Sequence, residues 1–129
     1  MQVVKPGPDH DTSRGVIAGA EISSASVGAS SIFMGRCRVP PGATSRPHYH
    51  ANCESTLYML SGEMLIHFGD QLEQEVRLVP GDLLYVPPNE THVLENVSET
   101  ENIEYVVARN APTEDSVEVP WAGTEAVPG

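Results

Sequence analysis

The sequence predicts a single all-β domain built from short antiparallel strands, and three observations lead to that prediction. Eleven glycines and eleven prolines interrupt the 129 residues too often for long helices. No segment keeps the apolar spacing of an amphipathic helix through three turns. Short β-branched and apolar runs instead alternate with turn residues at fairly even intervals, which is typical of an antiparallel sandwich or barrel.

Strands are predicted where these apolar runs occur, and turns where Gly, Pro, Asn or Asp cluster between them. The predicted strands are residues 15–18, 31–39, 55–60, 64–68, 75–79, 83–86, 92–96 and 103–109. A chain of this length can bury one core, so we expect a single domain over residues 1–129. An arm over residues 1–14 precedes the barrel. An extended acidic tail over residues 110–129 follows it, with Trp121 as an apolar anchor.

The charge balance limits the partners that the protein can have. Eighteen acidic residues oppose seven basic ones, for a formal net charge of -11, which argues against binding to nucleic acid or to an anionic membrane surface. No apolar run approaches the ~20 residues that cross a bilayer. The N-terminus also lacks the apolar core of a signal peptide, and two cysteines without a CxxC pair predict no disulfide framework. We therefore expect a cytoplasmic protein.

Two histidines stand two residues apart in the segment 42–62. On a strand, the side chains of His48 and His50 leave the same face. Burying an imidazole without partners costs about 1–3 kcal/mol for each unsatisfied group, whereas one divalent ion satisfies both rings. Taken alone, the pair is equally compatible with two solvent-exposed histidines.

A second strand–turn–strand segment, residues 81–96, carries His92 just after its turn. Together the two segments resemble the paired motifs of the cupin superfamily, G-x5-H-x-H-x3/4-E-x6-G and G-x5-P-x-G-x2-H-x3-N. The positions that fall in register are Gly42, His48, His50, Gly62, Gly81, Pro87, His92 and Asn96. Asn89 stands where the second motif has its turn glycine, a mild departure because asparagine tolerates positive φ. The resemblance covers residues 42–96.

This resemblance implies a double-stranded β-helix, or jelly-roll barrel, in which His48, His50 and His92 bind one divalent metal ion. The carboxylate ligand of the family would fall at position 55, so Ser55 departs from the pattern. Glu54 is adjacent, but strand parity places it on the face opposite to Ser55. A bulge could still turn Glu54 inward and make it the fourth ligand.

His67 is the other candidate for a fourth ligand. It lies in the predicted strand 64–68, which the resemblance puts beside the strand that carries His92. If the side chain of His67 faces inward, it completes a four-histidine site. If the alternate residues of its strand form the buried face instead, His67 is exposed.

A sphere made only of histidines carries no charge, so a bound divalent ion would act mainly as a Lewis acid. Nitrogen ligands suit several metals, and we favour zinc, with iron, manganese and nickel as alternatives. Iron oxygenase sites usually include a carboxylate, which is the doubtful ligand here.

Other polar residues are weaker candidates for catalysis. Glu63 could be a general base, and Tyr85 or Tyr105 could donate a hydrogen bond from the pocket wall. Arg36 and Arg38 share one face of their strand, where they could anchor an oxygen-rich substrate or simply face solvent. A metal-bound water is the remaining candidate for the base.

Within the superfamily, the chain resembles the small cupin-type cyclases of bacterial aromatic polyketide pathways. That resemblance implies aldol-type cyclisation and aromatisation of a poly-β-ketone, a small hydrophobic substrate, in an apolar pocket. The main alternative is a dioxygenase that uses iron or manganese on a small phenolic or organic substrate, and it is favoured if Glu54 is a ligand. A cupin that binds a metal or ligand without catalysis is the second alternative. Cupin barrels leave an edge strand and an apolar outer face, so we expect a homodimer.

Overall fold

The computed structural model describes residues 1–12, 15–113 and 116–119. Nearly all of the regular structure in these residues is strand, so the predicted all-β class is confirmed. The elements are β1 (His10–Asp11), β2 (Ile17–Ile22), α1 (Ser24–Val27), β3 (Phe33–Val39), β4 (His48–Tyr49), β5 (Ser55–Ser61), β6 (Met64–Phe68), β7 (Gln74–Leu78), β8 (Leu83–Val86), β9 (His92–Glu95), β10 (Ile103–Arg109) and β11 (Val117–Glu118).

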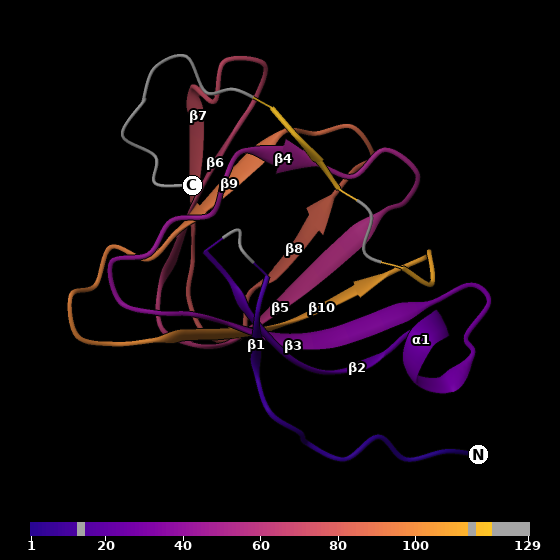
Figure 1. The fold of residues 1–129 in the computed structure, drawn as a ribbon. Helices are drawn as coiled ribbons and strands as arrows, with labels where there is room; N and C mark the ends of the chain where they lie inside the picture. The colour runs from indigo at the N-terminus through magenta and orange to yellow at the C-terminus, as the bar shows by residue number, and fades with distance from the viewer. Residues whose placement is uncertain (13–14, 114–115, 120–129) are drawn as a thin grey trace.

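The strands form two antiparallel sheets that enclose the core (Figure 1). The six-stranded sheet has the order β1-β2-β3-β10-β5-β8, and the five-stranded sheet has the order β11-β4-β9-β6-β7. Strands that are far apart in the sequence become neighbours, since β3 pairs with β10 and β4 pairs with β9. This interleaving is the jelly roll that the two motifs imply, and it brings the two histidine-bearing segments side by side.

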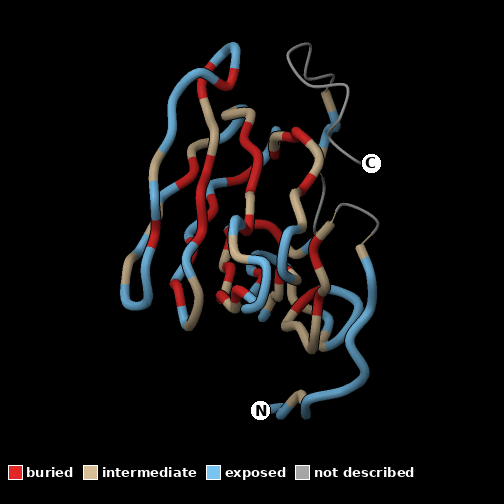
Figure 2. Tube along the Cα trace, turned by 90° about the vertical axis from the view of Figure 1, so that its left-hand side faces the viewer, coloured by how far each residue is buried: buried red, intermediate tan, exposed pale blue. Residues whose placement is uncertain are grey.

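Apolar side chains from both sheets fill the space between them. Burial alternates along the strands, so that Leu57 and Met59 of β5 and Tyr105 and Val107 of β10 point inward. Figure 2 shows buried segments recurring along the strands, while the N-terminal arm is largely exposed. The inner faces of β5 and β10 therefore provide one wall of the barrel interior.

Sequence patterns did not predict the helix α1. It is a single turn that begins after Ser23, whose side chain accepts a hydrogen bond from the backbone of Ser26, and it ends at Gly28. Its serine-rich sequence is typical of a loop, because serine favours caps and turns over helix interiors. No helix among the described residues has the length and hydrophobicity that crossing a membrane requires.

Short strands join part of each terminal segment to a sheet. The arm contributes β1, which pairs with β2, and the tail contributes β11, which pairs with β4. Each has two residues, too few to show an alternating pattern in the sequence. Strand β2 extends beyond the predicted 15–18 because it follows β3 through an irregular register. Trp121 lies outside the described residues.

Asn96, the last residue of the second motif, fixes the turn that follows β9. Its side chain is 2% exposed. Its amide nitrogen lies 2.7 Å from the carbonyl oxygen of Glu101 and 3.1 Å from that of Val39, and its Oδ1 accepts a hydrogen bond from the backbone of Ser98 at 3.0 Å. The residue thus ties the end of one sheet strand to the end of another and satisfies backbone groups that would otherwise be buried unpaired.

We predict that Asn96→Ala lowers the free energy of unfolding by about 3 kcal/mol, because several buried backbone groups lose their partner. Urea denaturation followed by circular dichroism measures this change. The exposed Asn102 offers a matched control, and Asn102→Ala should alter stability by less than about 0.5 kcal/mol. Equal losses in the two variants would contradict a structural role for the Asn96 amide.

Candidate metal centre

Three histidines from the two motif segments meet in the barrel interior. His48 in β4 and His92 in β9 are directly opposite each other across the strands, and His50 follows β4. Each is less than a tenth exposed, and their candidate ligand atoms all lie within 4.8 Å of one another. The ring centroid of His48 lies 4.4 Å from that of His92 and 5.2 Å from that of His50. The structure thus brings together the three residues that the motifs imply as ligands.

Backbone carbonyls orient two of the three rings in the same way. Nδ1 of His48 lies 2.7 Å from the carbonyl oxygen of Arg46, and Nδ1 of His92 lies 2.8 Å from that of Glu90. A carbonyl oxygen can only accept, so each Nδ1 carries the proton and each Nε2 carries the lone pair. Metal-binding histidines are commonly held by this kind of hydrogen bond. Because the acceptor is two residues back in both motifs, the same local turn recurs in both halves of the site.

Hydrogen bonds between the two motif segments hold the histidines in place. The backbone N–H of Ser45 donates to the carbonyl of Leu94 at 2.8 Å, and the N–H of Leu94 donates to the Ser45 hydroxyl at 2.9 Å. The N–H of Asn89 donates to the carbonyl of His50 at 2.9 Å. Asn89 has a φ of 66°, so asparagine occupies the left-handed position expected of the motif glycine. These hydrogen bonds therefore fix the positions of the two segments that carry the histidines.

Burial keeps the His92 ring neutral. Burial is the largest of the effects that together lower the pKa of His92 to about 4; His50 and Arg109 nearby act in the same direction, while the hydrogen bond to the Glu90 carbonyl opposes the shift. A neutral imidazole presents the lone pair that a metal ion needs.

The histidines line a small cavity between the sheets. Its volume is about 50 Å³, which is room for a few water molecules or for the reacting end of a larger molecule. Seven aliphatic side chains line it, namely Val16, Leu57, Ile66, Leu84, Val86, Leu94 and Val107. Among the described residues, no aspartate or glutamate lines it. Tyr105 also faces the cavity, whereas Tyr85 does not, so the structure distinguishes two tyrosines that the sequence left equal.

Residues 35–108, which include both histidine segments, match the family described as Cupin domain. The chain belongs to the cupin family. A relative in Streptomyces glaucescens, the tetracenomycin polyketide synthase protein TcmJ, is 30% identical over 109 residues, which are 84% of this chain and 70% of the relative. The predicted cupin barrel and the predicted likeness to cupin polyketide cyclases are both confirmed.

Solved structures share the fold of this cupin. The polyketide cyclase RemF from Streptomyces resistomycificus superposes with a TM-score of 0.72 at 19% identity, covering 96% of this chain and 84% of that one. The oxalate decarboxylase of Bacillus subtilis, which has Mn(II) centres, superposes with a TM-score of 0.71 at 21% identity, covering 81% of this chain and 28% of that one.

Ser55 takes the place of the carboxylate in the cupin pattern. Ser55 is 3% exposed and faces the cavity, while Glu54 faces outward, as strand parity predicted. The carboxylate of Glu54 accepts a hydrogen bond from the phenol of Tyr85 at 2.8 Å on the outer side of the barrel. The bulge that could have turned Glu54 inward is absent from the described pairing of β5 with β8.

His67, one of the two candidates for a fourth ligand, lies away from the three histidines. Its Nε2 donates to Glu95 at 2.8 Å, and its Nδ1 lies 3.8 Å from Glu75. Ile66 and Phe68 on either side of it pack against the core, so His67 has the opposite orientation. Its two carboxylate neighbours are residues of β9 and β7 on the outer face of the five-stranded sheet.

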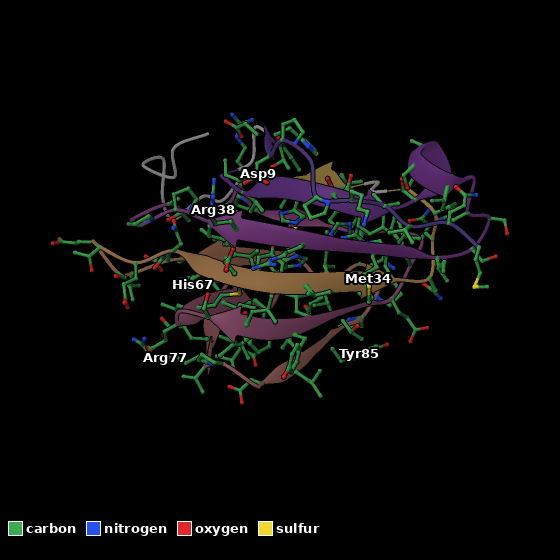
Figure 3. The ribbon with its side chains drawn as sticks, turned by 90° about the horizontal axis from the view of Figure 1, so that it is seen from below. Asp9, Met34, Arg38, His67, Arg77 and Tyr85 are labelled. Carbon is green, nitrogen blue, oxygen red and sulfur yellow. The ribbon has the colours of Figure 1, made fainter. Side chains whose placement is uncertain are left out.

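Glu63, Tyr85, Arg36 and Arg38, which were among the weaker candidates for catalysis, lie away from the cavity. Glu63 forms an ion pair with Arg77 at the surface, and Tyr85 is 56% exposed. Arg36 pairs with Glu104 at 3.0 Å on the outer face of β3, where Arg38 lies beside Asp9 (Figure 3). Their alternation along the strand already allowed this solvent-facing arrangement, and the structure selects it.

Sequence reasoning missed Arg109, which lines the cavity and is 7% exposed. A signal was present, because position 109 has the same parity as the inward-facing Tyr105 and Val107 in β10. The usual preference of arginine for the surface concealed it.

The contact between Glu54 and Tyr85 yields a spectroscopic prediction. The carboxylate of Glu54 raises the pKa of the Tyr85 phenol above its usual value of 10.0, chiefly through their hydrogen bond. Glu54→Gln should therefore lower the pKa of Tyr85. An alkaline titration of tyrosinate absorbance measures it, and Tyr85→Phe identifies which of the four tyrosines contributes the transition. An unchanged titration in Glu54→Gln would mean that Glu54 faces elsewhere.

Proposed function

We propose that this cupin is a metal-dependent cyclase that catalyses aldol-type ring closure and aromatisation of a poly-β-ketone. The observation that carries the proposal is a group of three buried imidazoles in a cavity with no carboxylate among its described lining residues. Similarity to the tetracenomycin polyketide synthase protein TcmJ and the shared fold of the cyclase RemF support it.

His48, His50 and His92 would hold the ion. Their donor set fits a divalent metal because the rings are buried close together, and the Nδ1 hydrogen bonds of His48 and His92 leave Nε2 of each free to bind an ion. Three protein ligands with further positions open are typical of catalytic zinc sites, so we favour zinc over iron, manganese or nickel. The ion would supply Lewis acidity toward a ketone or enolate oxygen.

The side chains of the cavity would position the substrate. Aliphatic walls exclude water and favour a folded poly-β-ketone whose reacting carbons approach each other. The phenol of Tyr105 lies in the same wall and can donate a hydrogen bond to a substrate oxygen. Cyclisation needs a base for the α-proton, and the described cavity residues include no carboxylate for that task.

The first test is metal content. The purified protein should bind about one equivalent of zinc, and His92→Ala should weaken zinc binding by at least about 100-fold because a ligand is lost. His67→Ala removes the same side chain from the neighbouring strand and should leave zinc binding unchanged. Elemental analysis and competition with a chromogenic chelator measure both. Zinc loss in His67→Ala with retention in His92→Ala would reject the proposed ligand set.

The second test is turnover. Zinc-loaded protein incubated with a linear poly-β-ketone should yield a cyclised aromatic product that has lost water, which mass spectrometry detects. With His92→Ala, the rate of cyclisation should be no higher than without protein. Bound iron together with oxygen consumption on phenolic substrates would instead support a dioxygenase. Metal binding without turnover of either substrate class would support a non-catalytic binding protein.

We further propose a homodimer through the outer face of the six-stranded sheet. Exposed apolar side chains occur there on β3, β5 and β8. Met34 and Tyr85 (Figure 3) lie in one cross-strand row with Ala108 and Thr56 between them, and Tyr58 and Leu83 are paired across β5 and β8. Contiguous apolar surface of this kind is typical of protein interfaces. Strand β8 is also the edge of its sheet, which a partner could cover.

Leu83→Glu should shift the protein from dimer to monomer, because it places a charge among the apolar side chains at the edge strand of this face. Size-exclusion chromatography with light scattering measures the mass. Val79→Glu is the matched control, since Val79 is also an exposed apolar residue but lies after β7 in the other sheet, and it should leave the mass unchanged. A monomeric wild-type protein would reject the proposal outright.

A further inference from the structure

A buried arginine without a carboxylate partner lies in the wall of the histidine cavity. Arg109 ends β10, is 7% exposed and lines the cavity. Its Nε and Nη1 atoms are buried and have no hydrogen-bond partner. Its guanidinium carbon lies 4.4 Å from the centroid of the Phe33 ring, so an aromatic face supports one side of the charge.

Ser55 stands directly beside this arginine. The two residues are paired across β5 and β10, and both side chains face the barrel interior. The Ser55 hydroxyl oxygen is also buried without a hydrogen-bond partner. Three unsatisfied polar atoms therefore lie on neighbouring strands of the same cavity wall, at the position where the cupin pattern places a carboxylate.

Arg109 differs from the other described arginines in how its charge is compensated. Arg36, Arg38, Arg46 and Arg77 each pair with a carboxylate. Among the described residues, Arg109 has no such partner and no acidic residue lines the cavity. Burying an unpaired cation is unfavourable, and a water molecule would satisfy hydrogen bonds without compensating the charge. The positive charge of Arg109 in the cavity wall is therefore not balanced by a negative charge among the described lining residues.

We infer that Arg109 and Ser55 form a subsite that binds an anionic oxygen of the substrate, either a carboxylate or an enolate. A guanidinium forms strong charge-assisted hydrogen bonds to such an oxygen, and the serine hydroxyl adds a further donor. This inference deepens the proposed function, because it assigns the ionised part of the substrate to the wall formed by β5 and β10. Binding of an anion in the cavity can be measured without any turnover, so the anion subsite and the cyclisation activity are tested separately.

Acetate and acetamide test the subsite, since they have nearly the same shape and differ in charge. Titrations of the 129-residue chain, without metal and again with zinc, can be followed by shifts of protein resonances in NMR. The metal-free protein should bind acetate at least about tenfold more tightly than acetamide. Acetylacetone titrated below and above its ionisation tests the enolate. Preference for acetate alone assigns a carboxylate, preference for the acetylacetone anion alone assigns an enolate, and preference for neither anion overturns the inference.

Variants connect any preference to the two residues. Arg109→Gln should abolish the preference for the anion, and Arg109→Lys should restore part of it. Arg36→Gln makes the same charge change on the outer face of the neighbouring strand, and it should retain the full preference. An unchanged preference in folded Arg109→Gln would contradict the assignment.

Ser55→Glu provides a second test in case the Arg109 variants fail to fold. It places a carboxylate beside Arg109, so it should raise the melting temperature while abolishing the preference for acetate. A Ser55→Glu protein that still prefers acetate would also contradict the assignment. If the wild-type protein keeps the preference for the anion yet neither binds zinc nor cyclises a poly-β-ketone, the proposed function fails and the anion subsite remains.

Discussion

Three buried imidazole rings share one small volume inside the barrel, and burial lowers the pKa of His92 among them. The ring centroids are only 4.4 Å to 5.7 Å apart, so protonated rings at these positions would repel one another strongly. The structure meets this constraint by giving the Nδ1 protons of His48 and His92 to backbone carbonyls and by surrounding the rings with aliphatic walls. The pairing of β4 with β9, the jelly-roll order of the strands and the closed core all serve to keep that arrangement.

The distribution of charge follows from the same constraint. The chain is strongly acidic as a whole, none of the described acidic residues is buried, and some of them pair with arginines at the surface. The interior has the reverse character, because Ser55 replaces a carboxylate and Arg109 adds a cation. The barrel therefore separates a negative exterior from a cavity that attracts negative charge.

The sequence predicts the fold well where its patterns are long and alternating. The bounds of β6, β8 and β10 agree with the predicted strands, and the motif spacing correctly brings His48, His50 and His92 together. It could not give the direction of His67, because Leu65 is buried on the same face and removes the apolar alternation that would have revealed it. Arg109 was missed for the opposite reason: its parity was clear, but its residue type is usually exposed.

The backbone hydrogen bonds between Ser45 and Leu94 and between Asn89 and His50 hold the nitrogen cluster without help from an ion. In the smallest zinc modules, folding and metal binding are one event, and chelation unfolds the chain. Here the apolar core supplies folding free energy, so the three histidines are held in place by the fold. A divalent ion could therefore be exchanged at constant architecture, which would make the supply of metals in the cell, rather than the protein, decide which ion it carries.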